Sequence, residues 1–287
     1  MRRHIGWALA SVVSLGFSGL GAASAADMAV KALPVVAPVV AYNWTGCYIG
    51  AHVGYGWGRD TNDFGRAVAS GPTEEGIFAP GEFGPFNHTT SGGVAGGQAG
   101  CNYQAANNFV IGVEGEAFWS GMKGSYTALE ENFPVGDPGQ FSRFESRNLW
   151  DADLAARFGY AWGRALLYGK AGVALGGFSY TETHDDFPTT HSCPGVAFVN
   201  GQFVNGQCSV GVSKTQAGLL LGVGLEYGFT NNWTGKVEYD YIDYGTFNLP
   251  YPSAAAAIQS FSVHETKQIV KVGVNYRFNS GPVVAKY

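Results

Sequence analysis

Every second residue is apolar in the stretch Cys47-Tyr48-Ile49-Gly50-Ala51-His52-Val53-Gly54-Tyr55-Gly56-Trp57, and most of the residues in between are glycine. Side chains of a β-strand alternate between its two faces, so this pattern predicts a strand with one apolar face. The strand is longer than the ~5–6 residues of an average strand in a soluble protein. Its length suits a tilted strand that crosses a membrane, which needs ~9–11 residues.

The same alternation recurs along the chain in further segments. They cover residues 95–103, 109–119, 150–160, 167–175, 219–227, 233–241 and 270–278. The short connections are 105–108, 161–164 and 230–232, and the long ones are 59–91, 121–148, 178–214 and 245–264. Structureless loops of such length are unusual in a compact soluble domain. Short periplasmic turns that alternate with long extracellular loops are typical of an outer-membrane barrel.

We therefore predict an all-β fold: an eight-stranded antiparallel transmembrane β-barrel with short periplasmic turns and four long extracellular loops. Only helices and closed barrels satisfy every backbone polar group inside hydrocarbon. The apolar face would point to lipid and the polar face to the lumen, with aromatic residues at the strand ends as interface girdles. A soluble β-sandwich or a lipocalin-like barrel is the alternative. The glycine-rich, sparsely charged polar face argues against it.

The composition agrees with a strand-rich protein with two distinct faces. Glycine accounts for 43 of the 287 residues, and charged residues make up 14%, against ~25% in a typical soluble protein. The formal net charge is -5. Because no basic face is evident, the composition argues against nucleic acid as a partner.

The chain begins with the basic residues Arg2 and Arg3 and continues with an apolar run that ends at the small residues Ala23-Ser24-Ala25. This pattern predicts a signal peptide over residues 1–25, with an N-terminal membrane anchor as the alternative. A Pro/Ala-rich periplasmic linker is expected over 26–42, the barrel over 43–278 and a tail over 279–287. Export from a Gram-negative cytoplasm would place the cysteines in an oxidising compartment.

Several motifs resemble the porin-like outer-membrane β-barrel family of alphaproteobacteria, small rhizobial and related surface proteins of which some bind haemin. The motifs are Trp44-Thr45-Gly46-Cys47-Tyr48-Ile49-Gly50, Gly92-Gly93-Val94-Ala95-Gly96-Gly97-Gln98, Lys236-Val237-Glu238-Tyr239-Asp240-Tyr241 and Val270-Lys271-Val272-Gly273-Val274-Asn275-Tyr276-Arg277-Phe278. The resemblance covers Trp44 to Phe278 and implies an integral outer-membrane protein. Outer-membrane lipid and the barrel-assembly machinery, which reads a terminal aromatic, are the implied partners. Residues follow Phe278, so either Phe278 or Tyr287 serves as that aromatic.

Acidic and basic residues alternate onto the predicted lumen side of the strands. They are Glu114, Glu116, Asp151, Asp153, Arg157, Lys170, Glu226, Lys236, Glu238, Asp240, Lys271 and Arg277. Buried charges must be paired and hydrogen-bonded, and eight strands enclose little more than their own side chains. We expect an ion-pair network that plugs the barrel. A narrow pore that prefers cations is the alternative.

The four cysteines suggest two disulfides. Cys47 and Cys101 fall near the periplasmic ends of neighbouring strands with the same parity, so they can meet directly across the pair. Two free thiols that face the lipid are the alternative. Cys193 and Cys208 bracket part of the third long loop, and a bridge there would restrain the unfolded chain.

No residue pattern indicates catalysis, and we expect neither an enzyme nor a bound cofactor or metal. His184 and His191, near Asp185 and Asp186, are candidates for a haem or metal site in the third loop, although their spacing is not diagnostic. They could also form part of a hydrolase at the barrel rim. The function that we favour is a passive barrel with a structural and surface-display role. A weak diffusion porin and a loop receptor for haem are the alternatives.

Overall fold

The fold is known from a computed structural model that describes residues 42–64, 86–129, 141–184, 198–199, 202–203, 208–251 and 259–278. All of them belong to one compact unit, Val40–Tyr287. Its long strands are β1 (Gly46–Phe64), β2 (Phe86–Gln104), β3 (Phe109–Ser120), β4 (Lys123–Leu129), β5 (Phe141–Trp162), β6 (Ala165–His184), β9 (Cys208–Gly228), β10 (Trp233–Tyr251) and β11 (Gln259–Phe278). A separate hairpin is formed by β7 (Phe198–Val199) and β8 (Gln202–Phe203). The described part of the chain contains no helix that could cross a membrane.

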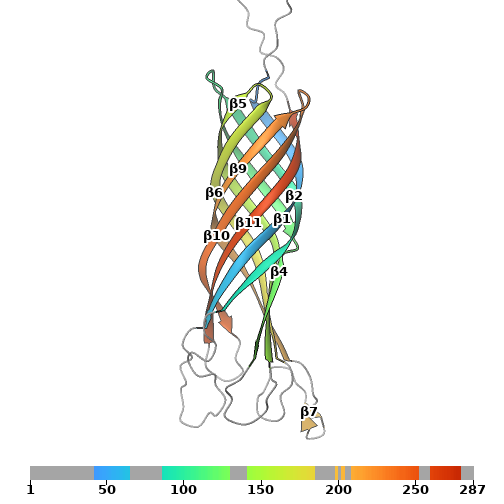
Figure 1. The fold of residues 1–287 in the computed structure, drawn as a ribbon, viewed down its shortest axis with the longest axis vertical. Coiled ribbons are helices and arrows are strands. Elements are labelled where there is room, and N and C mark those ends of the chain that lie inside the picture. The colour runs from blue at the N-terminus through green and yellow to red at the C-terminus, as the bar shows by residue number, and fades with distance from the viewer. Residues whose placement is uncertain are drawn as a thin grey trace, which may run out of the picture. The chain divides into compact units, whose positions relative to one another are not determined.

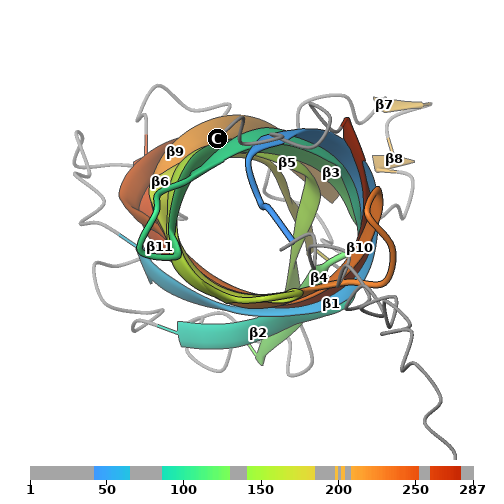
Figure 2. The ribbon, with the colours of Figure 1, turned by 90° about the horizontal axis from the view of Figure 1, so that it is seen from above.

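The long strands form a closed antiparallel barrel (Figures 1 and 2). Closure occurs at β1, which pairs with β2 on one edge and with β11 on the other. In the described residues β3 and β4 are two parts of one crossing, because β5 pairs with β4 over residues 141–147 and with β3 over residues 150–160. The chain therefore runs along the barrel wall eight times, as the sequence predicts.

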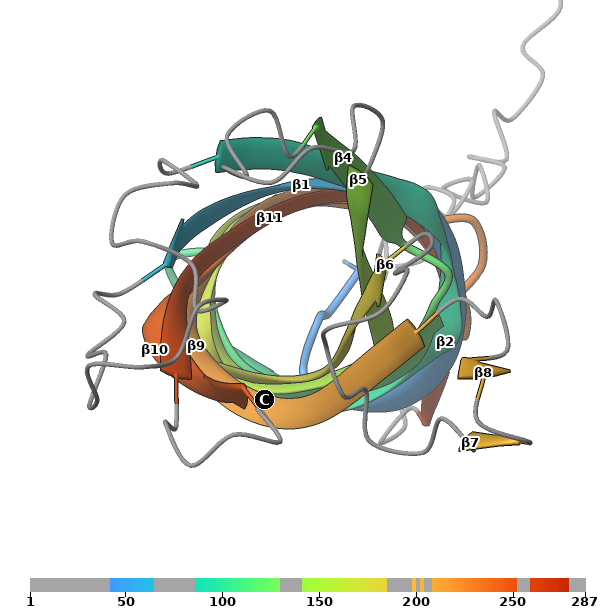
Figure 3. The same cartoon turned by 90° about the horizontal axis from the view of Figure 1, so that it is seen from below.

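The barrel has two different ends. At one end, which we call the turn end, neighbouring strands are joined by short turns such as 105–108 and 163–164. Asn108 and Gly163 adopt positive φ angles of 67° and 57°, which tight turns of this kind require. The other end, which we call the loop end, is where the strands that are separated by the longer stretches of sequence begin and end (Figure 3).

The part of the wall near the turn end carries an apolar band on its outer surface. The exposed side chains there include Leu154, at 63% exposure, and Val173, at 60%. On the inner side, glycines make room for the side chains that fill the lumen: a Cβ atom on Gly222 would collide with Asp240 and Lys170. The outer limit of the band is marked by the exposed tryptophans Trp57, Trp119 and Trp150.

The strands continue beyond this band towards the loop end, so the predicted long loops are too long. Residues 59–64, 86–91, 141–148 and 178–184 are strand, as are 208–214, 245–251 and 259–264. The polarity of the two faces is reversed there. On β6, Phe178 and Tyr180 are buried inside while Ser179 between them faces outwards. The alternation from which the strands are predicted belongs to the apolar outer face, and that face ends at the tryptophans.

Candidate functional site: the charged lumen

All twelve charged residues assigned to the lumen by sequence parity are buried inside the barrel. They come from alternate positions of β3, β5, β6, β9, β10 and β11. They do not form one uniform network. Nine of them make a central cluster, while Asp151 lies nearer the loop end and Arg277 lies at the turn end. Asp153 has no Lys or Arg nitrogen within ion-pair distance among the residues that the structure describes.

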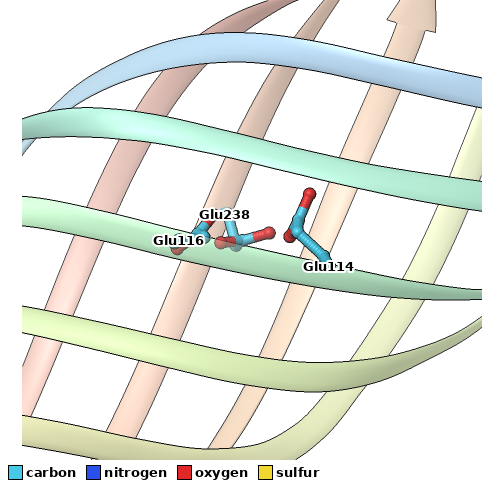
Figure 4. A group of neighbouring side chains, drawn as sticks. All are labelled: Glu114, Glu116 and Glu238. Carbon is cyan, nitrogen blue, oxygen red and sulfur yellow. The ribbon is translucent and has the colours of Figure 1, made fainter.

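Three carboxylates meet at the centre of the barrel (Figure 4). Glu114 and Glu116 from β3 and Glu238 from β10 bring ligand oxygens within 4.8 Å of one another. Three ammonium groups lie among these oxygens. They belong to Lys170 on β6, Lys236 on β10 and Lys271 on β11.

Each lysine bridges several carboxylates. Lys236 Nζ lies 2.7 Å from Glu116, 3.4 Å from Glu114 and 3.3 Å from Glu238. Lys170 Nζ lies 2.9 Å from Glu238 and 3.3 Å from Glu116. Such a donor set of three carboxylates also suits a hard cation. Here the chain's own ammonium groups are hydrogen-bonded to the same oxygens, so they supply the positive charge that a metal ion would bring.

Lys271 joins this cluster to a fourth carboxylate. Its Nζ atom lies 2.6 Å from Asp240 and 3.0 Å from Glu238, and it also contacts Glu116. Lys271 is fully buried, and none of its contacts is to solvent-exposed groups. A buried charge needs this degree of pairing, because a partly satisfied one costs several kcal/mol.

Arg157 extends the cluster towards the turn end. Its guanidinium lies 2.9 Å from Glu226 and 3.3 Å from Glu114, and it stacks 3.8 Å from the centre of the Tyr168 ring. Glu226 also accepts hydrogen bonds from Thr234 and Asn275. These neutral partners are polar residues that sequence parity places in the lumen, but only the charged ones were singled out.

The turn end of the lumen is closed by the residues that precede β1. Trp44 is completely buried, and its indole N–H donates to the carbonyl of Gly163 at 3.1 Å. Arg277 donates to the carbonyl of Asn43 at 2.6 Å and stacks over the rings of Tyr42 and Trp44. Arg277 therefore anchors this N-terminal segment in the mouth of the barrel and does not take part in the central cluster.

The half of the lumen near the loop end is aromatic, which the sequence analysis did not predict. Phe178, Tyr180, Tyr244 and Phe247 form a buried cluster. Lys267, fully buried, lies above the Phe178 and Tyr244 rings and pairs with Asp151 at 2.7 Å. The sequence does contain a signal for this cluster. Beyond the outer tryptophans, aromatic residues occupy the alternate strand positions that point into the lumen.

A second polar cluster lies beyond the outer tryptophans. Asp60 on β1 stands opposite His88 on β2 and opposite Glu265 on β11. Ser146 on β5 donates to Asp60 at 2.5 Å, and His88 Nε2 lies 2.6 Å from the same hydroxyl. His88 and Asp60 lie in strands and not in the predicted long loop 59–91, and Glu265 lies in β11 before the predicted strand segment 270–278.

Aspartate, histidine and serine are the residue types of a hydrolase triad, but their arrangement differs. His88 Nε2 lies 3.0 Å from Asp60 as well as 2.6 Å from Ser146, so the acid and the hydroxyl meet the same ring nitrogen. In a triad the acid orients the opposite nitrogen. The other ring nitrogen of His88 faces Asn62 at 3.3 Å. We assign this cluster no catalytic role.

The acids of this cluster titrate differently. Burial opposes the ionisation of Asp60, but hydrogen bonds from Glu265, His88 and Ser146 outweigh it and hold the pKa of Asp60 below its usual value. Burial and the neighbouring Asp60 raise the pKa of Glu265 well above its usual value. Between these two pKa values the pair therefore holds a single proton, on Glu265.

The family model for the outer membrane protein beta-barrel domain matches residues 14–278 of this chain. The chain belongs to this family. The 31 kDa outer-membrane immunogenic protein of Brucella melitensis is 33% identical over 261 residues, which cover 89% of this chain and 93% of that protein. The 22 kDa outer membrane protein of Rhizobium leguminosarum is 28% identical, over 71% of this chain and 74% of that protein.

The outer membrane protein OprG of Pseudomonas aeruginosa is 11% identical and covers 83% of this chain and 98% of that protein, with a TM-score of 0.41. The family and its named relatives locate this barrel in the outer membrane. The turn end then faces the periplasm and the loop end faces the exterior, as in other barrels of this kind.

One of the two predicted disulfides is present in this family member. Cys47 and Cys101 are direct partners across β1 and β2 and are joined by a disulfide near the periplasmic end. Cys193, the partner proposed for Cys208, lies outside the described residues. His191 also lies outside them, and for His184 only the backbone, at the end of β6, is described. The haem or metal site stays a prediction.

Proposed function

We propose that this barrel is a non-conducting structural protein of the outer membrane that displays its extracellular connections. The observation that carries the proposal is the filling of the lumen by three successive layers. The first layer is the segment around Trp44 that closes the turn end. The second is the central ion-pair cluster around Lys271, and the third is the aromatic cluster around Phe178 near the loop end. An ion would have to displace buried, fully paired charges in order to pass.

Conductance in a planar lipid bilayer tests this proposal. The wild-type protein is expected to give no steady single-channel steps. Removing a lysine and an acid together keeps the net charge and opens space in the lumen, as in the double variant Glu116→Ala with Lys271→Ala. We expect small but measurable steps from this variant. Migration that depends on boiling before electrophoresis would show that both proteins are folded.

Large, reproducible steps from the wild-type protein would contradict the proposal and favour a diffusion porin. A silent double variant that is folded would show that other layers suffice to close the lumen, and adding Trp44→Ala would then open the periplasmic mouth as well. If even this triple variant stayed silent while folded, the layers described here would not be what blocks the barrel.

A further inference from the structure

Basic residues lie on the outer surface of the wall just beyond the outer tryptophans. They follow the aromatic residue of their own crossing in the extracellular direction: Arg59 after Trp57, Lys123 after Trp119 and Arg147 beyond Trp150. Arg143 lies further out on β5. All four side chains are exposed. We call these four residues the basic patch.

The basic patch is short of negative charge. Glu145 is shared by two guanidinium groups, Arg143 at 3.1 Å and Arg147 at 3.1 Å. Among the described residues, no carboxylate lies within ion-pair distance of Lys123 or Arg59. Among the side chains of this surface that the structure describes, these four positive charges therefore face a single negative charge.

Two of these cations oppose each other directly. Lys123 on β4 and Arg147 on β5 are partners in the antiparallel register. Like charges at directly opposite positions destabilise a strand pair. A bound anion between them would reverse this effect, because it would neutralise both. In the described residues, the ladder between β4 and β2 consists of the pair Ser91 and Lys123.

Hydroxyl groups flank the cations on the same face. The register places Ser91 beside Lys123, Ser179 beside Arg147 and Thr89 beside Arg59. The strands on the other flank of β1 differ, although β11 is paired directly with β1. On β10 and β11 the described outward-facing residues beyond the band include the pair Asp243 and His264 but no lysine or arginine. The patch is thus confined to one side.

We propose that the basic patch binds the phosphate groups of a lipid in the outer leaflet. Tryptophan girdles mark the boundary between hydrocarbon and headgroups. A strand rises by at most ~3.3 Å per residue, so Arg59, Lys123 and Arg147, two to four residues beyond their tryptophans, lie within roughly 13 Å of that boundary. They project sideways from the wall, where lipid headgroups are found. The arginine fork and the lysine ammonium both suit phosphate oxygens, and the neighbouring hydroxyls add donors.

The test uses the full mature protein in nanodiscs of phosphatidylcholine that contain diphosphorylated lipid A as the probe. Binding is followed by native mass spectrometry as the amount of lipid A retained on the protein. Juxtamembrane cations contribute comparably and independently, so the double variant Lys123→Gln with Arg147→Gln is expected to bind about 30-fold more weakly. The matched control is Lys214→Gln. Lys214 lies on β9 in the extracellular half, but its register partner is the inward-facing Phe178.

The control is expected to bind like the wild type. Lipid A without phosphates should be retained no better than phosphatidylcholine, and inorganic phosphate in solution should not compete at equal concentration. Wild-type affinity in the double variant, or equal retention of the dephosphorylated lipid, would overturn the proposal, as would preference for a soluble polyanion such as heparin. If the double variant does not fold, Arg59→Gln with Arg143→Gln tests the same patch. The result does not depend on whether the lumen conducts.

Discussion

At the scale of single residues, the lumen shows how buried charges compensate one another. Lys271 contacts three carboxylates from β3 and β10, and each of these carboxylates contacts at least one further lysine. The pairing is therefore a network, in which each cation compensates several acids. Loss of one member leaves its partners buried with less compensation.

Replacing Lys271 with methionine removes the charge while keeping most of the side-chain volume. We expect the free energy of unfolding to fall by about 3–5 kcal/mol, because Glu116, Glu238 and Asp240 stay buried with one cation fewer. Urea unfolding in detergent micelles, followed by tryptophan fluorescence, measures the change. Lys214→Met, at a partly exposed position, serves as the control and should change stability by about 0.5 kcal/mol at most. Adding Glu116→Gln to Lys271→Met should restore part of the loss; no recovery would argue against a shared network.

The pair of Asp60 and Glu265 makes stability depend on pH. Because the pKa of Glu265 is raised in the folded protein, the unfolded chain binds fewer protons than the folded one once the pH exceeds the ordinary glutamate pKa of about 4.3. The contribution of Glu265 is thus complete below that pH and is lost as the pH rises towards the folded pKa. The lowered pKa of Asp60 acts in a separate, more acidic window, where its contribution is lost as the pH falls.

Glu265→Gln keeps a hydrogen-bond donor beside Asp60 and abolishes the titration. The advantage of this variant over the wild type should therefore increase as the pH is raised above about 5. Unfolding by urea across a series of pH values measures it. Thr266→Ala, at the neighbouring outward position, changes no titratable group, and its difference from the wild type should not vary with pH. A pH-independent difference for Glu265→Gln would show that the two acids do not share a proton.

At the scale of the elements, the sequence predicted the eight crossings and their order because the apolar outer face is continuous within the membrane. It failed where the environment changes. Beyond Trp57 the strand β1 continues to Phe64, but its outer residues become polar and its inner ones remain mixed. The alternation persists with the opposite polarity, as on β6 at Phe178 and Ser179. A search for strands with an apolar outer face therefore misses strand segments whose outer face contacts water.

The partners within the lumen were predictable only in part. Parity assigned all twelve charges to the interior, but it could not show which acid meets which base, because the contacts join strands far apart in the chain. Glu116 and Lys271, for example, are 155 residues apart. Lys267 and the aromatic cluster were missed because they lie beyond the last apolar outer residues of their strands.

The disulfide between Cys47 and Cys101 joins the first two strands next to the periplasmic turns. It closes a segment with a sequence separation of 54, and a loop of that length restrains the unfolded chain by about 4 kcal/mol in the chain-entropy model. Cys47→Ala with Cys101→Ala should therefore unfold at a lower urea concentration than the oxidised wild type. Wild-type protein treated with dithiothreitol is the matched comparison and should behave like the double variant. If the oxidised wild type and the variant unfolded at the same urea concentration, the disulfide would not stabilise the barrel.

At the scale of the whole molecule, the outer surface of the barrel wall meets two environments, hydrocarbon near the periplasm and water towards the exterior. Near the periplasm it is apolar outside and ionic inside; towards the exterior it is polar outside and holds an aromatic cluster and a second polar cluster inside. The same strands carry both patterns, so their hydrogen-bonded ladder is continuous while the environment of each face changes at the tryptophans. Surface position alone therefore decides whether a charge is tolerated on the outer face.

One substitution made at two heights of the wall tests this division. Leu154 on β5 faces outwards in the apolar band, and Ser213 on β9 faces outwards beyond it. In lipid vesicles, Leu154→Arg should lower the free energy of unfolding by about 2–4 kcal/mol, because a guanidinium at that depth must be pulled to an interface or desolvated. Ser213→Arg places the same group in water and should change it by about 0.5 kcal/mol at most. In detergent-free urea titrations, equal tolerance of the two arginines would mean that the band around Leu154 does not lie in hydrocarbon. If only Ser213→Arg strongly lowered the free energy of unfolding, the membrane would surround the loop end of the wall and not the turn end.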